Sequence, residues 1–168
     1  NRAIGGVWSA DGSRAALLDS AGRITVIELP SLATTASFVV DAAEGDREPS
    51  RGIERLEFDP AGRRLLVVPR WGSLEIRSLA SSDGLPAVAI DRDRLAFRDA
   101  TFLADSDLLG VWEPNGERID LASAIDGVVV EGSRIDRSAV TATPAARLRR
   151  AMPLADGRLL VETWGDRV

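Results

Sequence analysis

The sequence predicts an all-β fold made of repeated four-stranded antiparallel sheets. One phrase, an apolar strand followed by a small acidic or glycine-containing turn, occurs four times, at 7–12, 56–62, 101–107 and 152–157. Gly12 and Gly62 are 50 residues apart and Gly62 and Gly157 are 95 residues apart, which gives a repeat of about 48 residues. A repeat of this length describes the architecture of the whole chain, because each copy is one supersecondary unit.

Each copy contains strand signals in the same order. The second strand is a short, continuous apolar run, typical of a strand covered on both faces, and it is expected at 15–18, 65–68, 108–112 and 159–161. The third strand alternates instead, with Ile24 and Val26 on one face, so its other face is expected to contact water. A fourth, outer strand is expected at 37–40, 86–90 and 127–130. Residues 144–151 are the best helical candidate, although they stand where a first strand is due.

Repeated four-stranded antiparallel units are the building blocks of a β-propeller, in which each sheet buries its faces against the next. Residues 8–14 and 58–64 resemble the Phe-Ser-Pro-Asp-Gly turn of WD-repeat and TolB-like propellers. Ile27-Glu28-Leu29 and Ile119-Asp120-Leu121 occupy the place of the Trp-Asp-Leu that ends the third strand in that family. The resemblance covers nearly the whole chain but is degenerate, because the chain has no His for the family's Gly-His pair.

The resemblance implies a single partial propeller over residues 1–168. Its blade-like repeats are expected at about 4–41, 52–91, 98–131 and 147–168, the last one truncated within its third strand. This amounts to about three and a half blades and an incomplete ring, which further sequence or another chain would complete. Trp8, Phe58 and Phe102 share one position in the first strand and are expected to pack between blades.

Composition excludes several kinds of chemistry. The chain has no His, Cys, Tyr or Lys, so imidazole bases, thiol nucleophiles, disulfides and Schiff bases are excluded. The formal net charge of −5 argues against nucleic acid as a partner, and no apolar stretch approaches the ~20 residues of a membrane-spanning helix. No cofactor or metal is expected. The acidic pairs at 91–93 and 105–107 are interpreted as solvated turns, and Gly5, Gly6 and Gly72 as turn glycines.

One rim of the predicted propeller gathers unusual residues. If the first strand runs downward, the loops between second and third strands lie together on the top face. The candidate partner-binding residues there are Arg70, Trp71, Trp112, Trp164 and Asp166. Trp and Arg dominate binding hot spots, which favours a protein partner. The alternative is that Trp112 lies in the core and that Trp71 and Trp164 cover blade edges.

These patterns predict a non-enzymatic protein–protein interaction scaffold, a WD-like propeller portion of a larger bacterial multidomain protein or complex. Its partner is either another protein or the remaining blades of the same propeller. Two alternatives stay open: a propeller that gates or assists a hydrolase or peptidase module of an enzyme, and an envelope-associated propeller similar to TolB. The compartment is open between the cytoplasm, which we favour, and the periplasm or envelope.

Overall fold

The computed structural model divides the chain into two compact units, Asn1–Asp91 and Arg92–Val168, which are called unit 1 and unit 2. Each unit is described by itself. The residues that the structure describes are 3–40, 52–70, 72–80, 86–90, 99–103, 107–112, 118–128, 130, 135–136, 147–153 and 159–164.

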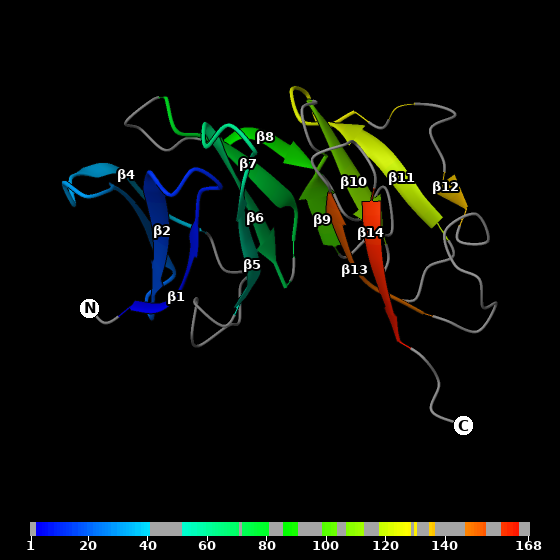
Figure 1. Ribbon diagram of the computed structural model, residues 1–168, viewed down its shortest axis with the longest axis horizontal. Helices are drawn as coiled ribbons and strands as arrows, with labels where there is room; N and C mark the ends of the chain where they lie inside the picture. Colours follow the sequence, from blue (N-terminus) through cyan, green and yellow to red (C-terminus); the bar gives the residue numbers. More distant parts are fainter. Residues whose placement is uncertain are drawn as a thin grey trace. The chain divides into compact units, whose positions relative to one another are not determined.

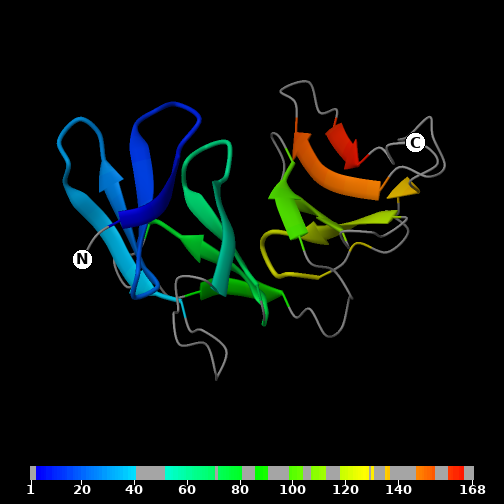
Figure 2. The same ribbon diagram turned by 90° about the horizontal axis from the view of Figure 1, so that it is seen from below.

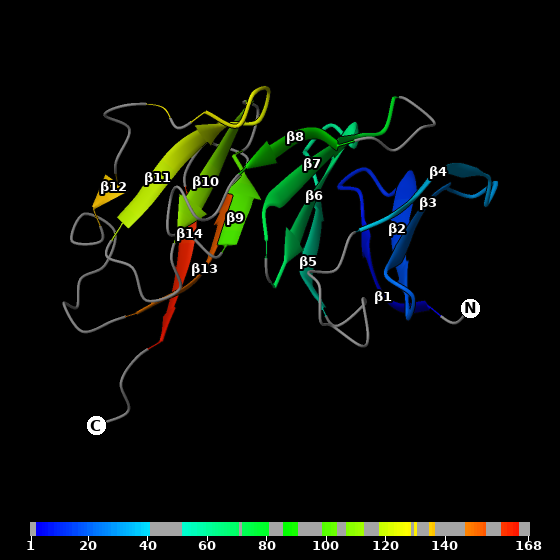
Figure 3. The same ribbon diagram turned by 180° about the vertical axis from the view of Figure 1, so that it is seen from behind.

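Unit 1 contains two four-stranded antiparallel sheets, and the strands of each sheet follow the order of the chain (Figure 1). Sheet 1 consists of β1 (Ala3–Trp8), β2 (Arg14–Asp19), β3 (Arg23–Glu28) and β4 (Thr34–Val39). Sheet 2 consists of β5 (Ile53–Phe58), β6 (Arg64–Pro69), β7 (Leu74–Ser78) and β8 (Pro86–Ile90). Figure 3 shows the same two sheets from behind, with β3 and β4 in view.

Unit 2 contains a four-stranded sheet and a two-stranded sheet, both antiparallel. Sheet 3 consists of β9 (Asp99–Phe102), β10 (Leu108–Trp112), β11 (Arg118–Ser123) and β12 (Ile135–Asp136). Sheet 4 consists of β13 (Arg147–Pro153) and β14 (Leu159–Trp164), drawn in orange and red in Figure 2. The prediction of an all-β chain of repeated antiparallel sheets is therefore confirmed.

The repeat of 50 residues is visible in the strand register of unit 1. Trp8 pairs with Ala15 in sheet 1 as Phe58 pairs with Leu65 in sheet 2. The register of both first strands also shifts near the start, between Ala3 and Gly5 and between Ile53 and Arg55. Such β-bulges bend a strand and leave one residue out of the ladder. Both sheets of unit 1 therefore repeat the same strand pairing, including this irregularity.

Three predictions from the sequence are corrected by the structure. Residues 147–153 form the strand β13, so the helical candidate at 144–151 is wrong over that part. The outer strand of sheet 3 is β12 at Ile135–Asp136, although Val128 and Val130 still form two backbone hydrogen bonds with β11. Gly5 and Gly6 lie inside β1 rather than in a turn, whereas Gly72 has the positive φ of a turn glycine, 82°.

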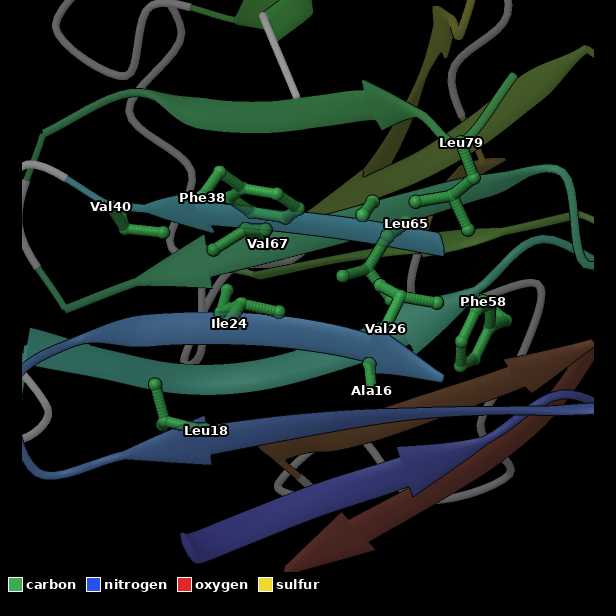
Figure 4. Close-up of a cluster of buried hydrophobic side chains, with 11 residues drawn as sticks. Ala16, Leu18, Ile24, Val26, Phe38, Val40, Phe58, Leu65, Val67 and Leu79 are labelled. Carbon is green, nitrogen blue, oxygen red and sulfur yellow. The ribbon is translucent and has the colours of Figure 1, made fainter. Parts of the chain in front are cut away.

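The core of unit 1 lies between its two sheets. Because side chains alternate along a strand, one face of β3 places Ile24 and Val26 in this core while Arg23 on the other face is exposed, as predicted. Figure 4 shows the cluster. Sheet 1 and the residue after β4 contribute Ala16, Leu18, Ile24, Val26, Ala36, Phe38 and Val40, and sheet 2 and the residue after β7 contribute Phe58, Leu65, Val67 and Leu79.

The turn between the first and second strands is fixed by side-chain oxygens. In sheet 2, Asp59 is 1% exposed and accepts hydrogen bonds from the backbone N–H groups of Arg63 (2.6 Å) and Arg64 (2.9 Å). In sheet 1 the same place is taken by Ser9, whose Oγ accepts from the Arg14 N–H (2.9 Å). Arg14 then donates to the backbone oxygen of Gly62 (2.7 Å), which ties the turn of sheet 1 to the turn of sheet 2.

Asp11 stabilises the turn of sheet 1 as a carboxylate. Its oxygens accept hydrogen bonds from the Ser9 hydroxyl (2.6 Å), from the Ser13 N–H (3.0 Å) and from the Ser13 hydroxyl (2.8 Å). Hydrogen bonds to a charged carboxylate favour its ionised form. These bonds, that of Ser9 foremost, lower the pKa of Asp11 from 3.8 to about 2.

We expect the Asp11 contribution to stability to be complete above pH 3.8 and to be lost as the pH falls from 3.8 to about 2, since the folded pKa is below the unfolded one. A carbon NMR titration of the Asp11 carboxyl should give the low pKa directly. Ser9→Ala should raise it more than Ser13→Ala, because the hydrogen bond from the Ser9 hydroxyl is the largest cause of the lowered pKa. Equal pKa values in the wild type and in Ser9→Ala would contradict this assignment.

In the described ranges, no helix has both the length and the apolar character needed to cross a membrane.

Candidate functional site

The predicted partner-binding residues do not all remain candidates in the structure. Arg70 follows β6 and is exposed, and its N–H donates to the Gly52 oxygen (2.5 Å). Trp112 is only 1% exposed, which removes it from the candidate surface and agrees with the alternative that it lies in the core. Trp164 is the last residue of β14, and only its backbone is described. Trp71 and Asp166 lie outside the described residues.

The three first-strand aromatic residues have different environments. Phe58 is 7% exposed and Phe102 is fully buried, as expected for residues that pack between sheets. Trp8 is 64% exposed, so its predicted burial is wrong in this structure. Phe58 packs on the side chains of sheet 1, whereas no described part of unit 1 covers the corresponding face of sheet 1. The sequence pattern gives the same prediction for both residues because their local surroundings are alike.

A cleft of about 420 Å³ opens between β1 and β5 in unit 1. It is lined by residues 4–7 of β1, residues 53–56 of β5 and Leu18 of β2. Gly52, which binds the Arg70 backbone, immediately precedes β5, so Arg70 lies at the same end of the sheet as the cleft. A volume of this size is within the range of ligand-binding pockets.

The two glycines of β1 contribute differently to the cleft. A Cβ on Gly5 would have no neighbour within 4 Å, so Gly5 leaves open space. A Cβ on Gly6 would lie 2.8 Å from the Ala16 oxygen and 3.1 Å from Leu17 Cδ2, so a side chain does not fit there without movement. The cleft therefore exists in part because β1 has no side chain at Gly5. The sequence signal was the Gly5-Gly6 pair, but its position beside β5 is a tertiary feature.

The cleft is mainly apolar, and its two charged lining residues are Glu54 and Arg55. Ile4 is 54% exposed at its mouth, and Val7, Ile53 and Leu56 are further apolar lining residues. Arg55 lies 3.6 Å from the Glu57 carboxylate, whereas the exposed Glu54 has no ion pair within the described part of the chain. Such a surface can hold an apolar side chain and place a carboxylate near a cationic neighbour. Among the described residues, no group of three or more Asp or Glu side chains could hold a metal ion.

No family model and no curated protein sequence matches this chain. A solved structure does: the β-propeller domain of Cps50 (Swd1) from Myceliophteria thermophila matches with a TM-score of 0.56 at 16% identity. The similarity covers 86% of this chain. The fold is that of a β-propeller. The resemblance to a WD-repeat-like propeller is thus confirmed at the level of the fold.

The chain spans 44% of the length of the solved propeller chain that it matches. The four-stranded sheets of this propeller are its blades, and the described part of the chain contains three of them together with the two strands of sheet 4. The predicted partial propeller is therefore confirmed as a fold class. This similarity shows the fold alone. The binding site is inferred from the residues of unit 1.

Proposed function

We propose that this chain is a non-enzymatic protein–protein interaction scaffold, a WD-like propeller portion of a larger bacterial multidomain protein or complex. The observation that carries the proposal is the open, mainly apolar cleft between the first strands of two neighbouring blades. The exposed Arg70 lies at the same end of sheet 2, next to the residue that precedes β5. Binding residues are concentrated on loops that a rigid scaffold positions. The cleft supplies shape and apolar area, and Arg70 supplies a charge at this end of the sheet.

The cleft suits a peptide segment of a protein partner. Apolar walls bury a side chain of the partner, and Gly5 leaves its backbone open to close approach. From the sequence alone, Trp71, Trp164 and Asp166 stay candidate partner-binding residues of the chain, and Trp is among the residue types that contribute most at protein interfaces.

The test uses the protein as it is produced in its own cells, with Gly5→Leu to fill the cleft and Arg70→Ala to remove the charge. Proteins crosslinked to the wild type are quantified by mass spectrometry, and the most enriched protein is then purified and titrated with the wild type and with each variant. We expect Gly5→Leu, Arg70→Ala and the Trp71→Ala/Trp164→Ala double variant each to raise the Kd for this partner by about tenfold or more.

Arg63→Ala is the matched control for Arg70→Ala, because Arg63 is an exposed arginine at the opposite end of β6. Its Kd should be unchanged. If the affinity for every enriched protein survives Gly5→Leu, Arg70→Ala and the double tryptophan variant, the assignment of this surface is wrong. A loss of hydrolase or peptidase activity without any loss of binding would favour the enzyme alternative instead.

A further inference from the structure

The β-bulges of unit 1 lie at the cleft. The register shift near the start of each first strand leaves one residue out of the ladder, Ile4 in β1 and Glu54 in β5. These two residues are 50 residues apart in the sequence, both are exposed, and both line the cleft. A bulge re-aims the side chain of its extra residue. The same backbone feature therefore brings one side chain from each sheet to this place.

The bulge in β5 decides where the Glu54 side chain points. In a regular strand, side chains two residues apart share a face, so Glu54 would lie on the same face as Leu56, toward sheet 1. In the structure, Ile53 and Leu56 both pack against the apolar cluster between the two sheets. The extra residue makes this possible, because it shifts the alternation by one. Glu54 is thereby exposed at the cleft instead of lying in the core.

The first strand of sheet 4 repeats the bulge with another residue. The register shift in β13 leaves Arg149 out of the ladder. Arg149 follows Glu54 by 95 residues, the same spacing as that between Gly62 and Gly157. The backbone irregularity thus recurs at one place of the repeat, whereas the residue there changes from isoleucine to glutamate to arginine. A fixed backbone shape with a variable side chain suits recognition better than packing, which requires similar residues in each copy.

The cleft combines an apolar lining with a carboxylate. Val7 and Leu56 pack against the core from the two first strands, and Leu18, which is 7% exposed, also lines the cleft. Gly5 shares a face with Val7 and has no side chain to fill the space. Among the described residues, Glu54 forms no ion pair. A segment bound here would therefore meet apolar surface and one unpaired carboxylate.

The other charged groups near the cleft do not neutralise this carboxylate. Arg55 pairs with Glu57, with 3.6 Å between the guanidinium and the carboxylate. Arg70 lies at the same end of sheet 2, and it forms no ion pair with Glu54. The net charge of −5 over the whole chain also favours the approach of a basic segment. Charge complementarity at Glu54 thus selects a cation.

We propose that the cleft recognises a segment of the protein partner in which an apolar residue stands next to a lysine or an arginine. The apolar side chain fills the space that Gly5 leaves open, over Leu18 and Leu56. The basic group forms an ion pair with the Glu54 carboxylate. This partner chemistry rests on the proposed function, because it concerns the same cleft, and Glu54 is its specificity-determining residue.

The probe is a phage library of random peptides about ten residues long, selected on the full chain. Peptides that also bind Gly5→Leu are removed. We expect the wild type to enrich peptides in which an apolar residue stands next to a lysine or an arginine. Glu54→Lys should instead enrich aspartate or glutamate at the place of the basic residue, because two like charges at this contact repel each other.

The most enriched peptide is then synthesised and titrated by calorimetry. Glu54→Gln keeps the size of the side chain and removes its charge, and it should raise the Kd about tenfold, as the loss of one charge-assisted hydrogen bond does. Glu28→Gln is the matched control, since the Glu28 side chain is 47% exposed and lies outside the cleft lining, and its Kd should be unchanged. Added salt should weaken the wild-type complex more than the Glu54→Gln complex.

The variants separate this partner chemistry from the proposed function. If Gly5→Leu abolishes binding but Glu54→Gln leaves the Kd unchanged and Glu54→Lys selects the same peptides, the cleft binds a partner and the assignment of a basic residue is wrong. If no peptide distinguishes the wild type from Gly5→Leu, both are wrong. Enriched sequences that match part of this chain would assign the occupant to the same protein and would also overturn the proposal.

Discussion

We expect Phe58→Ala to lower the free energy of unfolding of unit 1 by about 3–5 kcal/mol, and Trp8→Ala to lower it by less than about 1 kcal/mol. The two residues occupy the same strand position, 50 residues apart, and pair with the same position of the second strand. Removing the Phe58 ring leaves a cavity between two sheets, since only 7% of this residue is exposed. Removing the Trp8 ring leaves no cavity in unit 1, because 64% of it contacts solvent.

Urea unfolding followed by far-ultraviolet circular dichroism measures both losses without depending on tryptophan fluorescence. Val39→Ala is a further control, as a second apolar truncation on the face of sheet 1 that points away from sheet 2, and it should also have a small effect, since Val39 is 45% exposed. Equal losses for Trp8→Ala and Phe58→Ala in the isolated chain would show that sheet 1 is covered on both faces.

The second large effect is expected at an ion pair within β7, on the face of sheet 2 that packs on sheet 1. Arg77 is 7% exposed, its Nε donates to Glu75 Oε2 (2.9 Å), and its guanidinium lies 4.6 Å from the centre of the Phe38 ring. We expect Glu75→Leu to lower the free energy of unfolding by about 3 kcal/mol, because it removes the Glu75 carboxylate from a guanidinium that is almost fully buried. This is the low end of the range for buried pairs, since the Glu75 side chain is 19% exposed.

The double variant Glu75→Leu/Arg77→Met tests this explanation. Replacement of both members of a buried ion pair by apolar residues is often neutral, so the double variant should recover most of the stability lost in Glu75→Leu. The same urea titration measures the single and double variants. If the double variant is as unstable as Glu75→Leu, the loss comes from packing of the Glu75 methylene groups rather than from the loss of the Arg77–Glu75 ion pair.

Much of the architecture was predictable because it depends on local patterns. The apolar run at 65–68 predicts a strand covered on both faces, and Leu65 to Val68 are fully buried in β6. The weakest predictions were at the outer strand of sheet 3 and at residues 144–151. In sheet 3, the outer strand was predicted at the apolar run 127–130, whereas the strand β12 follows this run at Ile135–Asp136. At residues 144–151, alanine and arginine favour a helix locally, whereas pairing with β14 makes residues 147–153 a strand.

The candidate site was less predictable because its parts come from separate blades. The rim was predicted from the order of strand directions and stays a prediction; the structure shows that Arg70 follows β6 and is exposed. Trp112 stands at a similar point of β10, but it is buried. The cleft depends on two strands about 50 residues apart that lie side by side, and on Gly5, whose missing side chain has no sequence pattern of its own.

By itself, the sequence determined the repeat, the strand positions, the turn chemistry of Asp11 and Asp59, and the fold class, because each of these depends on residues within one copy. Only the tertiary structure decided which faces are covered. Trp8 and Phe58 have the same place in the repeat and the same kind of strand pair, yet one is exposed and the other is buried. The burial of an aromatic side chain in a sheet is set by the next sheet, and that sheet is encoded elsewhere in the chain.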